Sequence, residues 1–484
     1  LDMVQTLQAY PNVKVIFNLV PSLLEQLMDY VNGTVKDKFL ELSYKPAAEL
    51  AREEQDFIRN NFFSINKDRV IAMFPRHYDL YFKKMRNVEF TTQDYLDLQV
   101  WFNLSWFDPS FRKTNPALQR LVDKARFFTE EEKREMLDQQ PEIIRQIIPA
   151  YKALMETGQV EVTLSPYYHP ILPLLYSTRI AKEANKHSTL PRQQFRYPED
   201  ARAQIGEGVK FFRNTFGVQP AGMWPSEEAV SEHILPLFME AGIKWIVADE
   251  AILFRSLKKK KRDTKLLYQP HLLRRADGDL AIVFRDRNLS DLIGFEYFKW
   301  KAEDAAANLL WHLNNINNAF KGDDILVTIA LDGENAWEYY PNDGIDFLRA
   351  LYTKLSEAKD IKTVTLKEYL AAHPPRSNIK RLSAGSWIFG EFSKWINSPF
   401  KNKAWEWLLE ARQAFDEARS GLSRQNQELA FKQICIAEGS DWFWWAGEDP
   451  DGSFDRLFRM HLINFYSILG RKHPEYLDAP LTPD

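Results

Sequence analysis

Short apolar runs rich in β-branched residues alternate with stretches of helical periodicity through most of the chain. Helical stretches such as 201–215 and 303–320 lie between the runs. This alternation is typical of parallel strands joined by right-handed crossovers, because a helix is the usual connection between two parallel strands. The sequence therefore predicts an α/β fold, with a hairpin at Asp277-Gly278. The apolar runs span residues 13–20, 160–164, 221–224, 243–248, 280–285 and 325–331.

The pattern changes twice along the 484 residues. From about 31 to 159 it is helical almost throughout, with a capping box at Thr129 and Glu132. This predicts a long helical insertion. Strand-like runs end near residues 373–375, beyond which helical periodicity dominates. We expect an α/β domain over 1–372, a linker over 373–386 and a helical domain over 387–484.

Charge and cysteine content exclude several classes of protein. Lys and Arg number 63 and Asp and Glu 67, which leaves a formal net charge of -4. This balance lacks the basic excess that binds nucleic acid or anionic membranes. Cys435 is the only cysteine, so an intrachain disulfide and a cysteine-clustered metal site are excluded. We expect a cytoplasmic protein with no nucleic-acid or membrane partner, and its oligomeric state stays open. Leu1 begins inside a helical pattern, so a start methionine and any signal peptide would lie upstream.

Acidic residues follow two of the apolar runs. Glu227 comes after the run that ends at Trp224, and Asp332 directly follows Leu331. Reactive groups of α/β barrels gather at the carboxyl ends of the strands, where partial desolvation raises the pKa of an acid. As a pair, the two acids would supply the nucleophile and the general acid/base for cleavage of a glycosidic bond with retention. Trp224 and Trp337 beside them favour a sugar site. The alternative is that each acid only caps the following helix.

Four segments together resemble conserved regions of glycoside hydrolase family 57, in the family's order and over essentially the whole chain. The resemblance implies an incomplete (β/α)7 barrel followed by an α-helical domain that completes the active cleft. It implies no metal and no cofactor. The segments are GQVEV leading into PYYHPILP (158–173), GMWPSE (222–227), LDGEN (331–335) and AEGSDWFWW (437–445).

The same resemblance implies roles for single residues. Glu227 matches the catalytic nucleophile and Asp332 the acid/base. Trp387 lies in a stretch, GSWI, that resembles the amylopullulanase-like branch, as do FNLVPSLLEQL and FRDRNLSDLIGFEY. Together with Trp337, the expected substrate-binding residues are His169, Trp224, Glu334, Trp387, Asp441 and Trp444.

The resemblance implies a retaining hydrolase that cleaves α-1,4 bonds of α-glucan oligosaccharides or polysaccharides, and α-1,6 cleavage stays open. One alternative is a 4-α-glucanotransferase or branching-type transglycosylase of the same family. A second is a non-catalytic α-glucan-binding relative, because the family's first region, a His-Gln-Pro motif on the first barrel strand, has no counterpart here. We expect that region to lie upstream of Leu1. A zinc-dependent deacetylase or mannosidase is disfavoured, because the nine histidines are scattered and none is paired at i, i+4.

Overall fold

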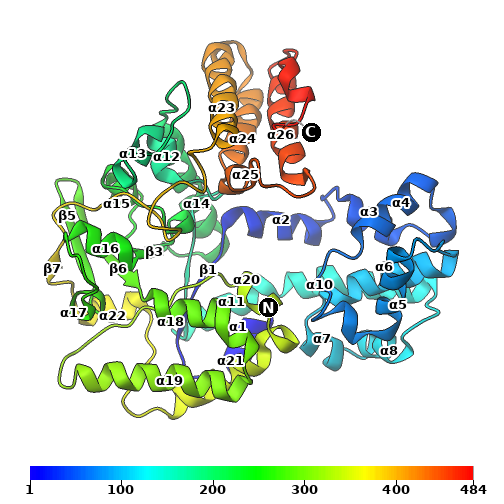
Figure 1. The fold of residues 1–484 in the computed structure, drawn as a ribbon, viewed down its shortest axis with the longest axis horizontal. Coiled ribbons are helices and arrows are strands. Elements are labelled where there is room, and N and C mark those ends of the chain that lie inside the picture. Colours follow the sequence, from blue (N-terminus) through cyan, green and yellow to red (C-terminus); the bar gives the residue numbers. More distant parts are fainter. Residues whose placement is uncertain (483–484) are drawn as a thin grey trace.

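The computed structural model describes residues 1–482, apart from the side chains of residues 335 and 336. A group of short strands lies between helices, a helical lobe extends to one side, and a helical bundle stands above the strands (Figure 1). The strands are β1 (Val15–Asn18), β2 (Val160–Thr163), β3 (Gly222–Met223), β4 (Trp245–Asp249), β5 (His271–Arg275), β6 (Gly278–Arg285) and β7 (Ser377–Asn378).

The strands from β1 to β6, apart from β5, run parallel and follow one another in chain order. β1 pairs with β2, and β3 with β4 and then β6. A single bridge from Leu164 to Met223 joins the two groups. β5 pairs with β6 in the antiparallel sense around Asp277-Gly278. The predicted parallel arrangement and the predicted hairpin are both confirmed.

The run at 325–331 differs from the prediction, because it forms no regular strand. Among the described residues, its one β-bridge to the sheet is parallel and joins Thr328 to Arg285. Two of its backbone amides bond to groups outside the sheet: Leu326 donates to the carbonyl of Tyr268 at 2.9 Å, and Ala330 to Ser290 Oγ at 3.1 Å. With those donors taken by loop groups, a ladder cannot continue along the segment.

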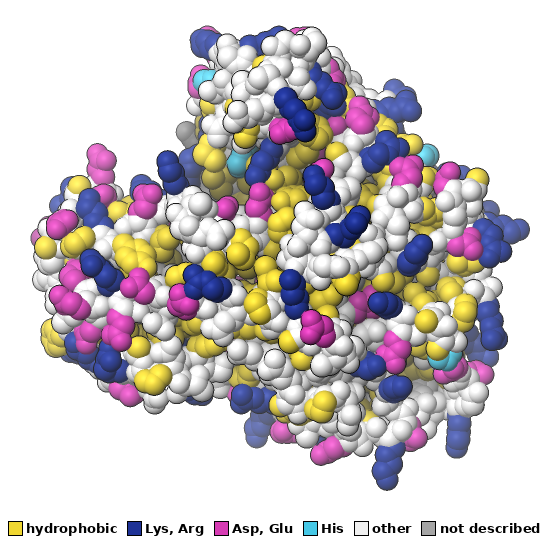
Figure 2. All heavy atoms as spheres, turned by 180° about the vertical axis from the view of Figure 1, so that it is seen from behind, with side chains coloured by type: hydrophobic (Ala, Val, Ile, Leu, Met, Phe, Trp, Pro, Cys, Tyr) yellow, Lys and Arg dark blue, Asp and Glu magenta, His cyan; other side chains and the backbone are white. Residues whose placement is uncertain are grey.

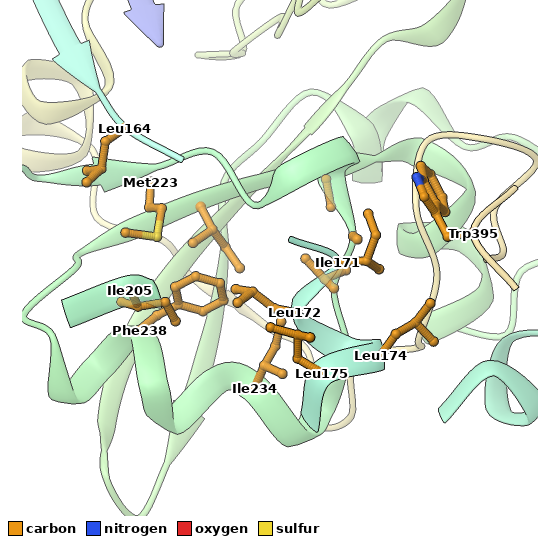
Figure 3. Packing of buried hydrophobic residues seen from close by; sticks show 14 of the residues in the cluster. Leu164, Ile171, Leu172, Leu174, Leu175, Ile205, Met223, Ile234, Phe238 and Trp395 are labelled. Atoms are coloured by element: carbon orange, nitrogen blue, oxygen red, sulfur yellow. The ribbon is translucent and has the colours of Figure 1, made fainter. Parts of the chain in front are cut away.

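Helices cover one face of the strands and form the main apolar core (Figure 3). Leu164, Met223 and Phe238 belong to this core, and all three are completely buried. Alternate residues of a strand point to opposite faces. The other face of β4 therefore carries Trp245 and Val247, which pack in a separate cluster with Leu366 and Tyr369 of α22. The helices of this part are α1 (Asp2–Gln8), α12 (Leu172–Tyr176), α13 (Ala181–Ala184), α14 (Pro198–Phe216), α15 (Leu235–Glu240), α16 (Glu250–Ser256), α17 (Thr264–Leu267), α18 (Arg287–Asp291), α19 (Ala302–Ala319), α20 (Asn335–Glu338), α21 (Ile345–Glu357) and α22 (Leu366–Ala372).

The segment between β1 and β2 is helical, as predicted, and most of it forms the lobe at the side of the molecule (Figure 1). The predicted capping box at Thr129 and Glu132 is present. The lobe has two apolar clusters of its own, one from Leu42 to Leu98 and one from Val100 to Leu137. The helices are α2 (Pro21–Asn32), α3 (Lys38–Tyr44), α4 (Arg52–Asn61), α5 (Pro75–Met85), α6 (Thr92–Trp106), α7 (Pro109–Thr114), α8 (Pro116–Lys124), α9 (Glu130–Leu137), α10 (Gln139–Arg145) and α11 (Ile147–Glu156).

The C-terminal region is helical, as predicted, with α23 (Pro399–Ala418), α24 (Arg424–Ala437), α25 (Ser440–Trp445) and α26 (Ser453–Ile468). The main apolar core runs from Val4 to Leu481 and so includes this region. The expected linker also belongs to the folded body, because β7 pairs with β5 and Gly385 forms a bridge with Val230.

Basic and acidic side chains are intermixed over the face of the molecule seen in Figure 2. Within residues 1–482, no helix combines the length and the apolar character needed to cross a membrane.

Candidate active site

Glu227 lies just beyond β3, in a single 3-10 turn, Ser226–Glu228, with a strained backbone. Its φ is 58° and that of Glu228 is 50°. Left-handed backbone is uncommon for residues other than glycine, and such strain persists only where the surroundings impose it. Here the segment after β7 holds the backbone in this conformation. The Trp387 amide donates to the Glu227 carbonyl at 3.1 Å, and Val230 and Gly385 exchange two backbone bonds of 2.8 and 3.0 Å.

The Glu227 carboxyl points at Trp387. The Trp387 indole Nε1 donates to Glu227 Oε2 at 2.7 Å. Trp224 packs edge-on against the Trp387 ring, with centroids 5.5 Å apart and planes at 77°. The structure therefore brings together three of the predicted residues, Glu227, Trp224 and Trp387, from two distant segments.

The charges around Glu227 identify its other neighbours. Burial raises the pKa of Glu227 to about 7, the hydrogen bond from Trp387 opposes that rise, and the charges of Asp332, Asp441 and Glu334 add to it. Charges exert such effects on a pKa only at short range. The charges of three other predicted acids, from two other parts of the chain, thus act on Glu227.

Asp332 is half-buried and lies three residues before α20. The backbone that leads to it is fixed at Thr328, whose carbonyl accepts from the amide of Asp286 at 2.7 Å, and at Ala330, whose carbonyl accepts from Arg285 Nη1 at 3.2 Å. Glu334 is exposed.

His169 joins the site from the segment after β2. Its backbone is left-handed, with φ 58°, and its Nδ1 lies 2.9 Å from Ser440 Oγ. The Ser440 amide donates to the His169 carbonyl at 3.0 Å. Burial lowers the pKa of His169 to about 4, so its imidazole is neutral at neutral pH. The contact fixes the residue before Asp441, whose charge acts on Glu227.

Asp441 is the second residue of α25 and is exposed. Desolvation nevertheless raises the pKa of Asp441, and the charge of Glu334 adds to the rise.

Two predicted residues make their contacts further out. The Trp444 ring packs on Trp395, with centroids 5.7 Å apart, and Lys394 Nζ lies 4.5 Å from its centre. The Trp337 ring packs on Tyr340 and over Gly344, where an added Cβ would lie 2.4 Å from the ring. Both rings are thus packed against structural neighbours.

Sequence reasoning missed a buried set of charges beneath the site. Asp249, at the end of β4, is completely buried and accepts from Arg285 Nε at 3.1 Å and from Arg287. Glu228 is completely buried too, and the charge of Arg285 limits the rise that burial causes in its pKa. The available signal was a charged residue at the end of each of two apolar strands. In the part of the chain that the structure describes, no three His, Cys, Asp or Glu side chains form a group able to hold a metal ion.

Relatives of known sequence include two α-amylases. The chain is 24% identical to alpha-amylase 1 of Dictyoglomus thermophilum over 269 residues, which are 54% of this chain and 33% of the relative. It is 23% identical to the alpha-amylase of Pyrococcus furiosus over 267 residues, which are 53% of this chain and 34% of the relative. The match therefore spans about a third of the length of each of these relatives.

Solved structures of similar fold include a branching enzyme of Thermococcus kodakaraensis, with a TM-score of 0.62 and 15% identity over 96% of this chain and 83% of that one. An alpha-amylase of Thermotoga maritima has a TM-score of 0.58 and 14% identity over 99% and 88% of the two chains. At these identities the likeness concerns the fold alone. The family model named Glycosyl hydrolase family 57 matches residues 2–381, which is most of the sequence, and the chain therefore belongs to that family.

Proposed function

We propose that the chain is a retaining glycoside hydrolase that cleaves α-1,4-glucosidic bonds of α-glucans. The observation that carries this proposal is the environment of the Glu227 carboxyl. It accepts a hydrogen bond from Trp387, and the charge of Asp332 raises its pKa. Two carboxyl groups on opposite sides of a glycosidic bond are what retaining cleavage requires, with a separation of about 5 to 5.5 Å.

In the proposed cycle, the Glu227 carboxylate attacks the anomeric carbon while Asp332 donates its proton to the departing glycosidic oxygen. A covalent glycosyl-enzyme forms. Asp332 then takes a proton from water, and the hydroxide oxygen displaces Glu227 with retention of the anomeric configuration. The indole N–H of Trp387 supports this division of roles, because a donor aimed at Glu227 favours its ionised form.

We further propose that the parallel strands form an incomplete (β/α)7 barrel. The support is their chain-order pairing from β1 to β6 and the bridge at Thr328. Residues 1–372 would be the catalytic barrel and 387–484 the helical domain that completes the cleft. In this arrangement His169, Trp224, Trp387, Asp441 and Glu334 contact the sugar, with Trp337 and Trp444 as outer aromatic residues.

Substitution of the two acids tests the function. With maltoheptaose as substrate, Glu227→Gln should reduce kcat beyond about 10⁴-fold, because no glycosyl-enzyme forms. Asp332→Asn should cost about 10² to 10⁴-fold, the usual contribution of positioned proton transfer. Asp279→Asn is the control, because Asp279 is exposed on the β5–β6 hairpin and pairs with Arg274. Turnover by Glu227→Gln near that of the control would refute the assignment.

Product analysis separates the proposal from its alternatives. NMR of the first products should show the α-anomer, since retention preserves the configuration of the substrate. Oligosaccharides longer than maltoheptaose would indicate transfer to a sugar hydroxyl, the reaction of a glucanotransferase or branching enzyme. Fold neighbours carry both names, a branching enzyme and the 4-alpha-glucanotransferase of Thermococcus litoralis. Binding without cleavage would favour a glucan-binding relative.

A further inference from the structure

Arg285 ends β6 and is almost completely buried. Its guanidinium makes three directed hydrogen bonds. Nε donates to Asp249 Oδ2 at 3.1 Å, Nη1 to the carbonyl of Ala330 at 3.2 Å, and Nη2 to Asp291 Oδ1 at 2.9 Å. These partners belong to three different segments, so the plane of the guanidinium is fixed from several sides.

A fourth contact leads from Arg285 to Glu227. The guanidinium carbon lies 5.1 Å from the centre of the Trp387 ring, within the range of a cation–π interaction. The same ring donates through Nε1 to Glu227 Oε2 at 2.7 Å. Rotation of the indole would break that hydrogen bond, and the guanidinium against the ring opposes such a rotation.

A parallel path leads from Arg285 to Asp332. The carbonyl that Nη1 holds belongs to Ala330, two residues before Asp332. The amide of Ala330 is held independently by Ser290 Oγ at 3.1 Å. One buried cation thus touches both the ring that orients Glu227 and the backbone that carries Asp332.

Burial of this cation is costly and needs a reason. A buried charge contributes less to stability than apolar residues of similar volume often would. Asp249 and Arg285 are both buried, and neither oxygen of the buried Glu228 carboxyl bonds to another described residue. Buried charges and strained backbone of this kind cluster at functional sites.

We propose that Arg285 is a positioning residue that sets the relative placement of Glu227 and Asp332, through the Trp387 ring on one side and the Ala330 carbonyl on the other. The inference rests on the proposed function for the roles of the two acids. Lysine would replace it poorly, because an ammonium group is a point charge without the planar fork that reaches three partners.

Kinetics with maltoheptaose test the proposal. Arg285→Gln should lower kcat by about 10²-fold with a much smaller change in KM, because misplacement of reacting groups affects the transition state most. Arg285→Lys should fall between this variant and the wild type. Arg287→Gln is the matched control, because Arg287 also pairs with Asp249 but has neither the ring contact nor the bond to Ala330. An equal loss in the control would show that only the support of Asp249 matters.

The pH profile and a double-mutant cycle add readouts that a loss of folded protein would not change. The hydrogen bond from Trp387 lowers the pKa of Glu227, so Arg285→Gln and Trp387→Phe should both move the acid limb of kcat/KM to higher pH. Their effects on kcat should multiply only in part in the double variant, because both substitutions break the path through the Trp387 ring. Fully multiplying effects, or an unmoved acid limb in Arg285→Gln, would overturn the proposal.

A third readout does not depend on activity. In protein labelled with ¹⁵N-tryptophan, the Trp387 indole resonance, assigned from Trp387→Phe, should shift in Arg285→Gln and stay in place in Arg287→Gln. An unchanged resonance would overturn the proposal. If Arg285→Gln does not fold, Arg285→Lys carries the test. If the wild type lacks activity, the proposed function fails and the resonance alone decides the inference.

Discussion

The Glu227 carboxyl lies under opposing influences. Burial and the charges of three neighbouring carboxylates favour its protonated form, whereas the Trp387 indole favours the ionised form. The balance raises its pKa to about 7, so a carboxylate needed as a nucleophile is difficult to ionise until substrate contacts or a neighbour's proton change the balance. When Glu227 is ionised, it therefore lowers the free energy of unfolding. Stability is commonly given up for reactivity in this way at active sites.

The raised pKa of Glu227 predicts how the stability of the protein depends on pH. A carboxyl whose pKa rises on folding, here to about 7, binds its proton more tightly when folded, so stability falls as pH rises from the unfolded value toward 7. Glu227→Gln removes this dependence and still accepts from Trp387. At pH 8 the variant should be more stable than the wild type by about 2 to 3 kcal/mol. At pH 4 the advantage should vanish. Urea unfolding at both values measures this, and an equal difference at both would contradict it.

Single residues show the limit of sequence reasoning at this scale. The prediction of Glu227 and Asp332 rests on the apolar run before each of them, a pattern that the sequence shows directly. The bond from Trp387 to Glu227 was not predictable, because it depends on a tertiary approach between residues 160 positions apart. Glu228 was missed because nothing in a sequence shows a left-handed backbone or a buried carboxyl there.

At the scale of elements, the site depends on the seam between the segment after β2 and the start of α25. Pro170 forms an antiparallel bridge with Gly439, and His169 bonds to Ser440. A buried ion pair also joins the helical C-terminal region to the rest of the chain. Arg412 of α23 donates to Asp200 of α14 at 2.8 Å. Together these contacts fix where α25 presents Asp441.

Gly439 is the closest point of this seam. An added Cβ would lie 3.0 Å from the Tyr168 carbonyl oxygen and 3.2 Å from the Ile436 carbonyl oxygen. Its backbone is ordinary, with φ −55°, so an effect of substitution would come from crowding alone. Gly439→Ala should lower the free energy of unfolding by about 1 to 3 kcal/mol, the usual cost of overpacking, and should raise KM for maltoheptaose by displacing Asp441.

Gly421→Ala is the matched control, because a Cβ there meets nothing within 4 Å and the backbone has no positive φ. Its effect should stay within about 0.5 kcal/mol. Equal unfolding midpoints for the two variants would contradict the prediction, because the backbone around Gly439 would then accept a Cβ without loss of stability.

At the scale of the whole molecule, periodicity was sufficient for the α/β pattern, the helical insertion and the C-terminal helices, because each element shows its own repeat. Periodicity does not show which of these elements pack into one core and unfold together. One apolar core extends from Val4 to Leu481, through both of the domains expected from the sequence, whereas the lobe packs in separate clusters between Leu42 and Leu137. Which segments share a core depends on contacts between elements distant in the chain.

These cores predict two cooperative units, the lobe and the rest of the chain. Ile434→Ala in α24 and Leu98→Ala in α6 each remove a completely buried side chain and should cost about 2 to 5 kcal/mol. In hydrogen exchange, Ile434→Ala should lower the protection of α24 and α14 together, because both belong to the main core. Leu98→Ala should lower protection within α5 and α6 while α14 keeps its own, since Leu98 lies in a separate cluster. The two variants thus serve as controls for each other.

Loosening of α24 without α14 would mean that the C-terminal helices open alone, and the placement of Asp441 would then fluctuate independently of Glu227.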